Sequence, residues 1–531
     1  MAAVSFSQLL NGERAVVTLF IVIVLFSLPL SLFLYGVALS LLAIFALFVE
    51  VRVETSTSLS QFKTRAGASS GILLGAVTLP TFMLSKLIQQ SRAFSLHHVH
   101  LGELNYMALQ YWAAFGSCFT VLMVLCLFTF DNTRSHSCRA WNAKFGLVCF
   151  LIGAELLFLY STTGVHAIWK LLWVFFHGFA AVKLVRHLLN AFPSCVSFGE
   201  ALLITVGLVL YFGDMLAYTI VKPYGYMTSS ELVFMQYGFR ENSTYSGARI
   251  CIEKGKSVIF FASLGFLIFV IIPSWIHFVQ DFDMHPLLWV VRFVFMEPVK
   301  RLSLCLYWVC VIYLSVLRFY NISKNSKTER ILLRKYYHLM AVLMFLPAVI
   351  LQPKFLDLAF GAALAVFLTL EIIRVWRIWP LGQLVHEFMN AFTDHRDSDL
   401  LIVSHFSLLL GCALPIWMSS GYNDRPPCSL CWNFEPWNWG IQWLSMVGHK
   451  YGVLRWSKTG KKTIEGTAAG IASVLAACSV LFPHLASTGY FLTEHWISLL
   501  LAVTVSGLLE AYTAQLDNAF IPLVFYSLLC L

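Results

Sequence analysis

The sequence predicts an all-α fold, a polytopic transmembrane helical bundle with roughly 13–16 spans. Its composition is the first reason: 59% of the 531 residues are hydrophobic, 12% are charged and the mean hydropathy is +0.76, whereas soluble domains carry about 25% charged residues. The second reason is that apolar segments of membrane-spanning length recur along the whole chain. Backbone groups in lipid must be hydrogen-bonded internally, so we expect helices and not an open sheet.

The apolar segments follow one another with short polar loops between them. A bilayer core about 30 Å thick needs roughly 20 apolar residues per helix, so the longest segments can form two passes. The first segment follows Glu13 and Arg14 and is too long for the apolar part of a cleavable signal peptide, so we expect it to anchor the chain as two spans. The segments are 15–48, 70–88, 108–130, 145–162, 165–184, 199–221, 256–278, 286–318, 338–373, 400–418, 464–483, 494–513 and 519–531.

The charge and the cysteines fit the same class of protein. The net charge of +9 comes from basic residues in the short loops, which is the positive-inside pattern and favours anionic headgroups. We therefore expect no nucleic-acid partner. The 13 cysteines are scattered and many lie within apolar segments, so they are expected to be buried small side chains and not a disulfide framework.

The polar residues divide the chain into two regions. Residues 1–255 form a multi-span membrane region that shows little chemistry in its sequence. Residues 256–531 carry polar clusters at the edges of the spans, among them a candidate nucleotide-binding loop at 445–466. We expect the second region to be the catalytic one.

The candidate nucleotide-binding loop combines glycines, lysines and a threonine. Glycines allow the backbone to approach a phosphate, paired lysines neutralise a triphosphate, and a threonine hydroxyl can bind a phosphate oxygen or a metal. It is not a Walker loop, because no glycine stands five positions before Gly460. The residues concerned are Gly448, Gly452, Lys461, Lys462, Thr463, Glu465 and Gly466.

A second cluster closes one span and opens the next. Glu510, Thr513 and Asp517 are spaced so that they would share one face of a helix. Carboxylates at such a place are costly unless they are paired or bound to a metal. We expect Asp517 to lie near the nucleotide-binding loop and to orient an acceptor hydroxyl or a cation.

Two further clusters allow a functional and a plain interpretation. Arg334 and His338 would lie on one helical face and could grip a phosphate, or they could belong to an ordinary basic membrane anchor. Asp394 and Asp397 could hold a divalent cation through hard oxygen ligands, or they could form a solvated loop.

Together these motifs make the chain resemble the dolichol kinase family. The resemblance covers about residues 285–531, and residues before it are matched mainly by their many spans. Several motifs in the same order make chance an unlikely explanation. The matching segments are Arg334–His338, Trp379–Gly382, Asp394–Ser398, Leu408–Trp417, Lys461–Gly466 and Leu509–Asn518.

The resemblance implies that CTP donates its γ-phosphoryl group to dolichol, which gives dolichyl phosphate for protein N-glycosylation. It implies a multi-pass protein of the endoplasmic reticulum membrane whose site faces the cytosol, with CTP as phosphoryl donor and a divalent cation, Mg or Ca. The catalytic residues would be Lys461, Lys462, Glu465 and Asp517. The nucleotide would be bound by the glycines, lysines, Thr463 and Glu465 of the loop together with Arg334 and His338. From the chemistry of their side chains, we expect Asp517, Asp394 and Asp397 to hold the cation.

Two alternatives stay open at this point. The nucleotide motif reports CTP and not the acceptor, so a kinase of another lipid alcohol such as phytol, or a cytidylyltransferase, fits it too. A polytopic transporter also combines many spans with intramembrane charges. The concentration of polar motifs at span ends in one region speaks against the transporter.

The resemblance fails at the start of its CTP motif. The family has an aspartate and an alanine ahead of the glycines, where this chain has Ile441 and Leu444. Residues 427–444 include four tryptophans and a Cys-x-x-Cys pair. We interpret 427–444 as a frame-shifted reading of the family segment; the alternative is a genuine divergent insertion that forms an aromatic interfacial loop. We expect irregular coil there and little or no activity in the unaltered chain.

Overall fold

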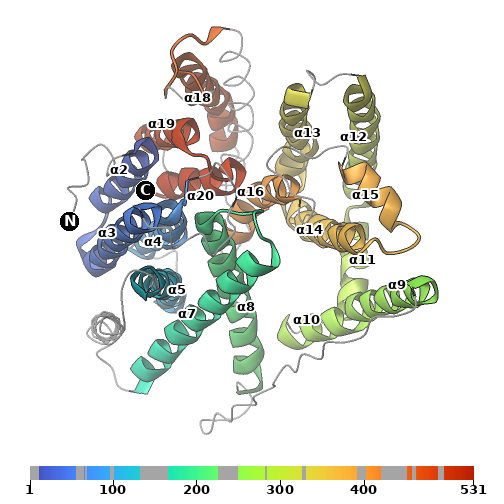
Figure 1. The fold of residues 1–531 in the computed structure, drawn as a ribbon, viewed down its shortest axis with the longest axis horizontal. Helices are drawn as coiled ribbons and strands as arrows, with labels where there is room; N and C mark the ends of the chain where they lie inside the picture. The colour runs from blue at the N-terminus through green and yellow to red at the C-terminus, as the bar shows by residue number, and fades with distance from the viewer. Residues whose placement is uncertain are drawn as a thin grey trace. The chain divides into compact units, whose positions relative to one another are not determined.

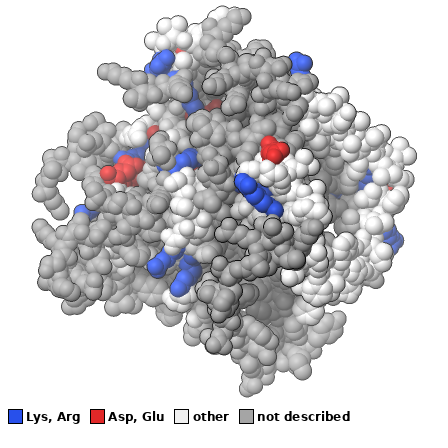
Figure 2. All heavy atoms as spheres, turned by 45° about the vertical axis from the view of Figure 1, so that its right-hand side comes forward, with Lys and Arg blue, Asp and Glu red and all other residues white. Residues whose placement is uncertain are grey.

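The fold is all-α in the part of the chain that the structure describes, as the sequence predicts. The structure is a computed structural model, and it describes residues 11–55, 65, 69–95, 101–131, 165–224, 249–280, 284–325, 330–390, 402–419, 451–456, 462–487 and 496–531. Within these ranges extended pairing is limited to one isolated antiparallel bridge. Among the described residues on the face drawn in Figure 2, charged side chains are few and lie in small patches.

The described helices follow one another along the chain as shown in Figure 1. The first are α2 (Gly12–Phe26), η1 (Leu30–Leu32), α3 (Phe33–Thr55), α4 (Ile72–Ser95), α5 (Leu101–Asp131), α7 (Val165–Ala191) and α8 (Phe198–Tyr224). The next are α9 (Arg249–Phe266), the π-helical turn η3 (Leu267–Ile271), α10 (Ile272–Gln280), α11 (Pro286–Met296), α12 (Pro298–Asn325), α13 (Arg330–Leu351), α14 (Pro353–Trp376) and α15 (Gly382–Asn390). The last are α16 (Val403–Ser419), α18 (Ile464–Ser487), α19 (Trp496–Tyr512) and α20 (Asp517–Leu529).

Eight of the described helices are long and apolar enough to cross a membrane. This confirms a multi-pass helical architecture, while the total of roughly 13–16 spans stays a prediction. The candidate spans are Leu30–Glu54, Ile72–Arg92, Leu104–Leu127, Leu171–Ala191, Phe198–Leu216, Ser257–Phe278, Pro298–Arg318 and Lys354–Trp376.

The chain forms two compact units, and each is built from stretches that are distant in sequence. The first unit contains residues 1–210, 311–361 and 394–531, and the second contains 211–310 and 362–393. In the first unit the early helices pack with the last ones: α2 contacts α19, and α4 contacts α20. The predicted division of function at residue 255 stays a prediction.

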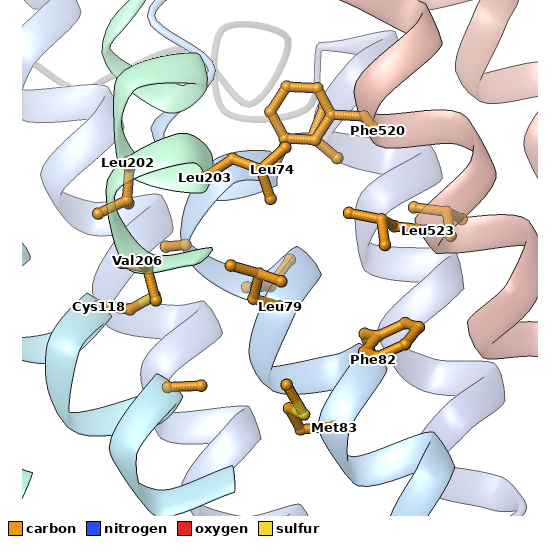
Figure 3. Packing of buried hydrophobic residues seen from close by; sticks show 14 of the residues in the cluster. Leu74, Leu79, Phe82, Met83, Cys118, Leu202, Leu203, Val206, Phe520 and Leu523 are labelled. Carbon is orange, nitrogen blue, oxygen red and sulfur yellow. The ribbon is translucent and has the colours of Figure 1, made fainter. Parts of the chain in front are cut away.

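The core of the first unit joins α4, α8 and α20. Figure 3 shows Leu74, Leu79 and Phe82 of α4 among side chains from α8 and α20. The rings of Phe82 and Tyr526 stack with centroids 5.3 Å apart. Packing of this kind, and not the hydrophobic effect, holds helices together inside a bilayer.

Two glycines bring α4 and α8 into backbone contact. A Cβ atom at Gly75 would lie 2.4 Å from the carbonyl oxygen of Gly199. Small residues at a helix crossing are the usual way for membrane helices to approach so closely. This contact holds the start of α8, where Glu200 lies, against α4.

The second unit has its own polar contacts. Arg374 of α14 makes a two-pronged ion pair with Glu371, at 2.8 and 2.6 Å. The backbone N–H of Trp379 donates to the hydroxyl of Ser257 at 3.1 Å, which ties the end of α14 to α9. The Arg301 guanidinium stacks on the Phe293 ring, 3.9 Å from its centroid.

Candidate functional site

The nucleotide-binding loop predicted from the sequence is anchored by a short antiparallel pairing. Arg455 and Thr463 form the isolated bridge. Ile464 N–H donates to the carbonyl of Leu454 at 2.8 Å, and Trp456 N–H donates to the carbonyl of Lys462 at 3.3 Å. This hairpin base, residues 454–456 with 462–464, leads directly into α18. It therefore fixes Lys462 and Thr463 at the N-terminus of a helix.

Thr463 caps α18. Its hydroxyl accepts a hydrogen bond from Gly466 N–H at 3.2 Å, as an N-cap threonine does. The Glu465 carboxylate accepts from Leu454 N–H at 2.9 and 3.3 Å and so holds the hairpin base on the helix. The N-terminus of a helix carries partial positive charge and favours bound phosphate.

Lys462 joins the hairpin base to the end of α19. Its ammonium donates to the backbone carbonyl of Glu510. Beside this contact the ring of Trp456 packs against that of Tyr512 with centroids 5.2 Å apart, and Trp456 Nε1 donates to the Thr467 hydroxyl at 2.9 Å. The structure thus brings together two motifs that are about 50 residues apart in the sequence.

The helix that carries Glu510 ends before Asp517, which corrects one expectation. Glu510, Thr513 and Asp517 were expected on one helical face, but α19 ends at Tyr512 and a new helix, α20, begins at Asp517. Glu510 and Thr513 are buried, and Asp517 is half-buried at the first position of α20. At the break, Gln515 N–H donates to the Thr513 hydroxyl at 3.1 Å, a local bond that competes with the helix. The Ala514 carbonyl and Leu516 N–H bond to distant parts of the chain.

The partners of that turn come from the first 200 residues. Arg65 Nη2 donates to the Ala514 carbonyl at 2.9 Å and to Glu200 Oε1 at 2.7 Å. The same Glu200 oxygen accepts from Leu516 N–H at 2.8 Å. The side chain of Gln515 is bonded as well. Its oxygen accepts from the Ser197 hydroxyl, and its nitrogen donates to the Ser69 carbonyl and hydroxyl, both at 2.9 Å.

A second polar cluster lies at the start of α2. Arg14 Nε pairs with Glu50 at 2.7 Å, and Arg14 Nη2 pairs with Glu54 at 2.5 Å. The neighbouring Glu13 accepts from the Ser69 hydroxyl at 2.9 Å. Burial, together with the nearby Glu50 carboxylate, raises the pKa of Glu13 to about 7.

These N-terminal residues are not among the site residues that the sequence predicts. Arg65 and Glu200 belong to no motif, and they stand 135 positions apart in the chain. One signal was available, since Glu200 and Glu50 lie in apolar stretches, and an ionisable residue within a membrane span marks a functional or paired position.

Several of the predicted site residues lie outside the described part. These are Gly448, Lys461, Asp394 and Asp397, and also Ile441 with the whole of 427–444. Arg334 and His338 lie on α13, but nothing of their side chains is described. Gly452 is described and half-buried, two residues before the hairpin base.

The described residues alone do not make a complete metal site. No group of three His, Cys, Asp or Glu side chains among them is arranged to hold an ion. Mg²⁺ is commonly held by one or two carboxylates together with the substrate phosphates and water. Asp517, as an oxygen donor next to the motif that contacts Lys462, fits such a partial set.

Comparisons with known proteins agree on one family. A family model described as "Dolichol kinase" matches residues 160–418. The chain is 56% identical to "Dolichol kinase EVAN" of Arabidopsis thaliana over 99% of both chains. It is 27% identical to the dolichol kinase of Homo sapiens over 88% of this chain and 87% of the human one. It is 32% identical to the dolichol kinase of Saccharomyces cerevisiae over 45% of this chain and 43% of that one. No solved structure matches the chain.

Proposed function

Because this chain belongs to the dolichol kinase family, we propose that it transfers the γ-phosphoryl group of CTP to dolichol and releases dolichyl phosphate and CDP. One observation in the structure carries the proposal: the bond from Lys462 to the Glu510 carbonyl. It joins the motif suited to a triphosphate and the motif suited to a cation and a hydroxyl.

The hairpin base and the start of α18 would hold the nucleotide. Phosphoryl transfer depends mainly on positioning and on compensating the charge of the phosphates. Lys462 supplies a full positive charge, and the N-terminus of α18 supplies the partial positive charge of a helix end. Lys461 would add a second charge, while Gly448 and Gly452 would let the backbone approach the phosphates. Glu465 has a structural part, because it fixes the hairpin base to the helix.

A divalent cation, Mg or Ca, would bridge phosphate oxygens and offset their charge. Asp517 is the described residue that would hold it, with Asp394 and Asp397 as further donors. Arg334 and His338 would contact the phosphates from α13.

The acceptor would reach the site from the bilayer. A polyprenol cannot leave the membrane, so its hydroxyl must meet the water-soluble nucleotide at the membrane surface. The end of α19 and the start of α20 flank the 514–516 turn. We propose that the hydroxyl meets the nucleotide beside this turn. We place the protein in the endoplasmic reticulum membrane with the site facing the cytosol, where its product would serve N-glycosylation.

The test uses membranes that contain the chain in two forms. One is the unaltered chain. The other, the motif-restored chain, carries Leu-Ala-Pro-Phe-Ala-Gly-Ile-Leu-Ser-Leu-Gly-Ile-Gly at 427–439 and Asp-Thr-Met-Ala at 441–444. Both are supplied with γ-labelled CTP and with dolichol or phytol.

We expect label in dolichyl phosphate, with CDP released, at least from the motif-restored chain. Release of pyrophosphate with a CDP-lipid, or transfer to phytol but not to dolichol, would contradict the proposal. The proposal would also be contradicted if neither form transferred label while a related dolichol kinase was active in the same assay. Membranes that lack the chain serve as the control for background activity.

A further inference from the structure

We propose that Arg65 and Glu200 are positioning residues for the transfer reaction. In this role they hold the 514–516 turn, and with it Asp517, in the arrangement that the reaction needs. The inference rests on the proposed function, in which Asp517 binds the cation or orients the acceptor hydroxyl. The frame itself, defined as Arg65, Ser69, Ser197 and Glu200 bound to the 514–516 turn, is a matter of geometry.

The frame binds each of the three residues of the turn at a different group. Arg65 binds the carbonyl of Ala514, Glu200 binds the N–H of Leu516, and serines bind both ends of the Gln515 amide. Two of these bonds involve a charged partner, and such bonds are about twice as strong as neutral ones. The turn therefore has little freedom to shift.

Glu200 is itself held in place at the start of α8. Its second carboxylate oxygen accepts from Ser197 N–H at 2.8 Å, and its own N–H donates to the Ser197 hydroxyl at 3.1 Å. Only 1% of the Glu200 residue is exposed. The Glu200 carboxylate is fixed at the start of a helix and paired with a buried arginine. It therefore holds Leu516, whose N–H it binds, in a defined position.

The lack of a side chain at Gly71 allows the Gln515 side chain to pack against the backbone there. Gly71 has a φ of +61°, and a Cβ atom there would lie 2.5 Å from the side chain of Gln515. The neighbouring helix start also approaches closely, because a Cβ at Gly199 would lie 1.9 Å from the Gly71 carbonyl oxygen. The backbone at Gly71 therefore lies directly against the Gln515 side chain. This close packing supports a role of the frame in fixing the position of the 514–516 turn.

The energetics of a buried ion pair favour this role over simple stabilisation. Removing two charges from water is costly, and replacing a buried pair by apolar residues is often neutral for stability. The pair of Arg14 and Glu50 offers a comparison, because it is buried and also 2.7 Å long. Its carboxylate, however, accepts from Leu73 N–H of α4, at 2.6 Å, instead of from the 514–516 turn.

The position of the turn matters because both of its ends belong to the proposed site. Before it stands Glu510, whose carbonyl receives Lys462, and after it stands Asp517. A misplacement of reacting groups by about 1 Å can lower a rate by about a hundredfold. Loosening the frame should therefore reduce kcat more than it reduces nucleotide binding, since the hairpin base is left intact.

The experiment compares two double variants that each remove both members of a buried ion pair; the control also takes the arginine partner from Glu54, whose side chain is 38% exposed. Arg65→Met/Glu200→Leu breaks the frame, and Arg14→Met/Glu50→Leu is the matched control. Thermal stability is measured for both in detergent. Kinetics are measured in the more active of the two forms of the chain defined above, and hydrogen exchange of residues 510–520 is measured in the unaltered chain.

We expect both double variants to keep a melting temperature near that of the parent. The frame variant should lose kcat by about tenfold or more while its KM for CTP stays within about threefold, which marks an interaction that acts in the transition state. Its 510–520 segment should also exchange faster. The control should keep its kcat and its exchange rate.

Three results bear on the two hypotheses separately. A frame variant that is stable and has the parent's kcat would overturn the positioning role. Unchanged hydrogen exchange at 510–520 would show that the frame does not hold the turn. A parent without kinase activity, together with faster exchange in the frame variant, would support the frame and contradict the proposed function. If the frame variant fails to fold, Glu200→Gln keeps a hydrogen-bond acceptor and gives the same two measurements.

Discussion

Lys462 has the chemistry of a movable phosphate ligand. Its half-buried ammonium donates to the backbone carbonyl of Glu510, which is a neutral acceptor. A phosphate oxygen forms a stronger, charge-assisted bond with an ammonium group than a carbonyl does. The flexible stem of lysine allows the group to move from one acceptor to the other while the hairpin base stays in place.

Lys462→Ala should therefore weaken the use of CTP severely, and Lys461→Ala should act in the same direction. Loss of one charge-assisted phosphate contact costs on the order of 1.5–3 kcal/mol, which is about tenfold or more in kcat/KM for CTP. The matched control is Lys300→Ala, because Lys300 is exposed and pairs with Glu297 at 3.1 Å in the second unit. Unchanged kinetics in both site variants would remove this loop from the site.

Asp517 should be needed for the chemical step. Asp517→Asn keeps the size of the side chain and its oxygen acceptor for the N–H of Asn518, which lies 3.3 Å away. It removes the charge that would hold a cation or orient the hydroxyl. We expect a loss of about tenfold or more in kcat, as for a contact made in the transition state, and a need for more Mg²⁺ to reach half of the remaining activity.

The control for Asp517 is Glu387→Gln in the second unit, where the exposed carboxylate bonds Gln383 at 2.7 Å. It should leave both measurements as they are. An Asp517→Asn protein with the parent's kcat and cation dependence would exclude Asp517 as a ligand or orienting group.

Among the helices, α16 and α20 meet where the proposed site begins. A Cβ atom at Gly411 of α16 would lie 2.0 Å from the carbonyl oxygen of Asn518, in the first turn of α20. The obstacle is backbone, so it cannot turn aside as the tip of a flexible side chain could. Any side chain at position 411 must push the two helices apart or move the residues next to Asp517.

Gly411→Ala should consequently lower both stability and kcat. Overpacking of this kind costs about 1–3 kcal/mol, which a lower melting temperature in detergent would report. Gly361→Ala is the control, since a Cβ at Gly361 in α14 would meet nothing within 4 Å. That variant should be unchanged or slightly more stable, because alanine suits a helix better than glycine by about 0.5–1 kcal/mol. Equal behaviour of the two variants would contradict the close contact at Asn518.

The sequence predicted the helices better than the place where one of them ends. Apolar segments identified the spans because lipid demands long apolar helices. The end of α19 at Tyr512 could not be read from Glu510, Thr513 and Asp517, whose spacing suits a continuous helix. At the break a local bond from Gln515 N–H to the Thr513 hydroxyl is joined by hydrogen bonds to Arg65 and Glu200, more than 300 residues away, for which no local pattern exists.

For the molecule as a whole, the same limit applies to the role of the N-terminal region. Its sequence shows spans and little chemistry, yet α2 packs on α19, α4 packs on α20, and buried polar residues reach the 514–516 turn. The proposed site near the C-terminus thus contacts helices near the N-terminus. The hairpin base with Lys462 and Thr463 lies within one continuous stretch of sequence, so a local pattern could point to these residues, whereas the contact from Lys462 to Glu510 has no local pattern.

The high sequence identity to a dolichol kinase and the residue at position 441 lead to different expectations about the activity of this chain. A chain that is 56% identical to a dolichol kinase over its whole length should fold as one. However, the position of the motif aspartate holds Ile441, whose side chain cannot bind a cation. We therefore expect the unaltered chain to enter the membrane and to show little or no kinase activity.

Restoring the family motif should recover activity if that aspartate holds the cation. The motif-restored chain described above should phosphorylate dolichol with CTP, whereas a chain that carries only the replacement at 427–439 should not, because it still lacks the carboxylate at 441. Sequencing the codons of 425–446 gives an independent check, since a frame-shifted reading requires that they spell the family motif in the shifted frames. If the unaltered chain is as active as the restored one, Ile441 is tolerated. The cation must then be bound elsewhere, and the acidic residues already named, Asp517, Asp394 and Asp397, become its ligands.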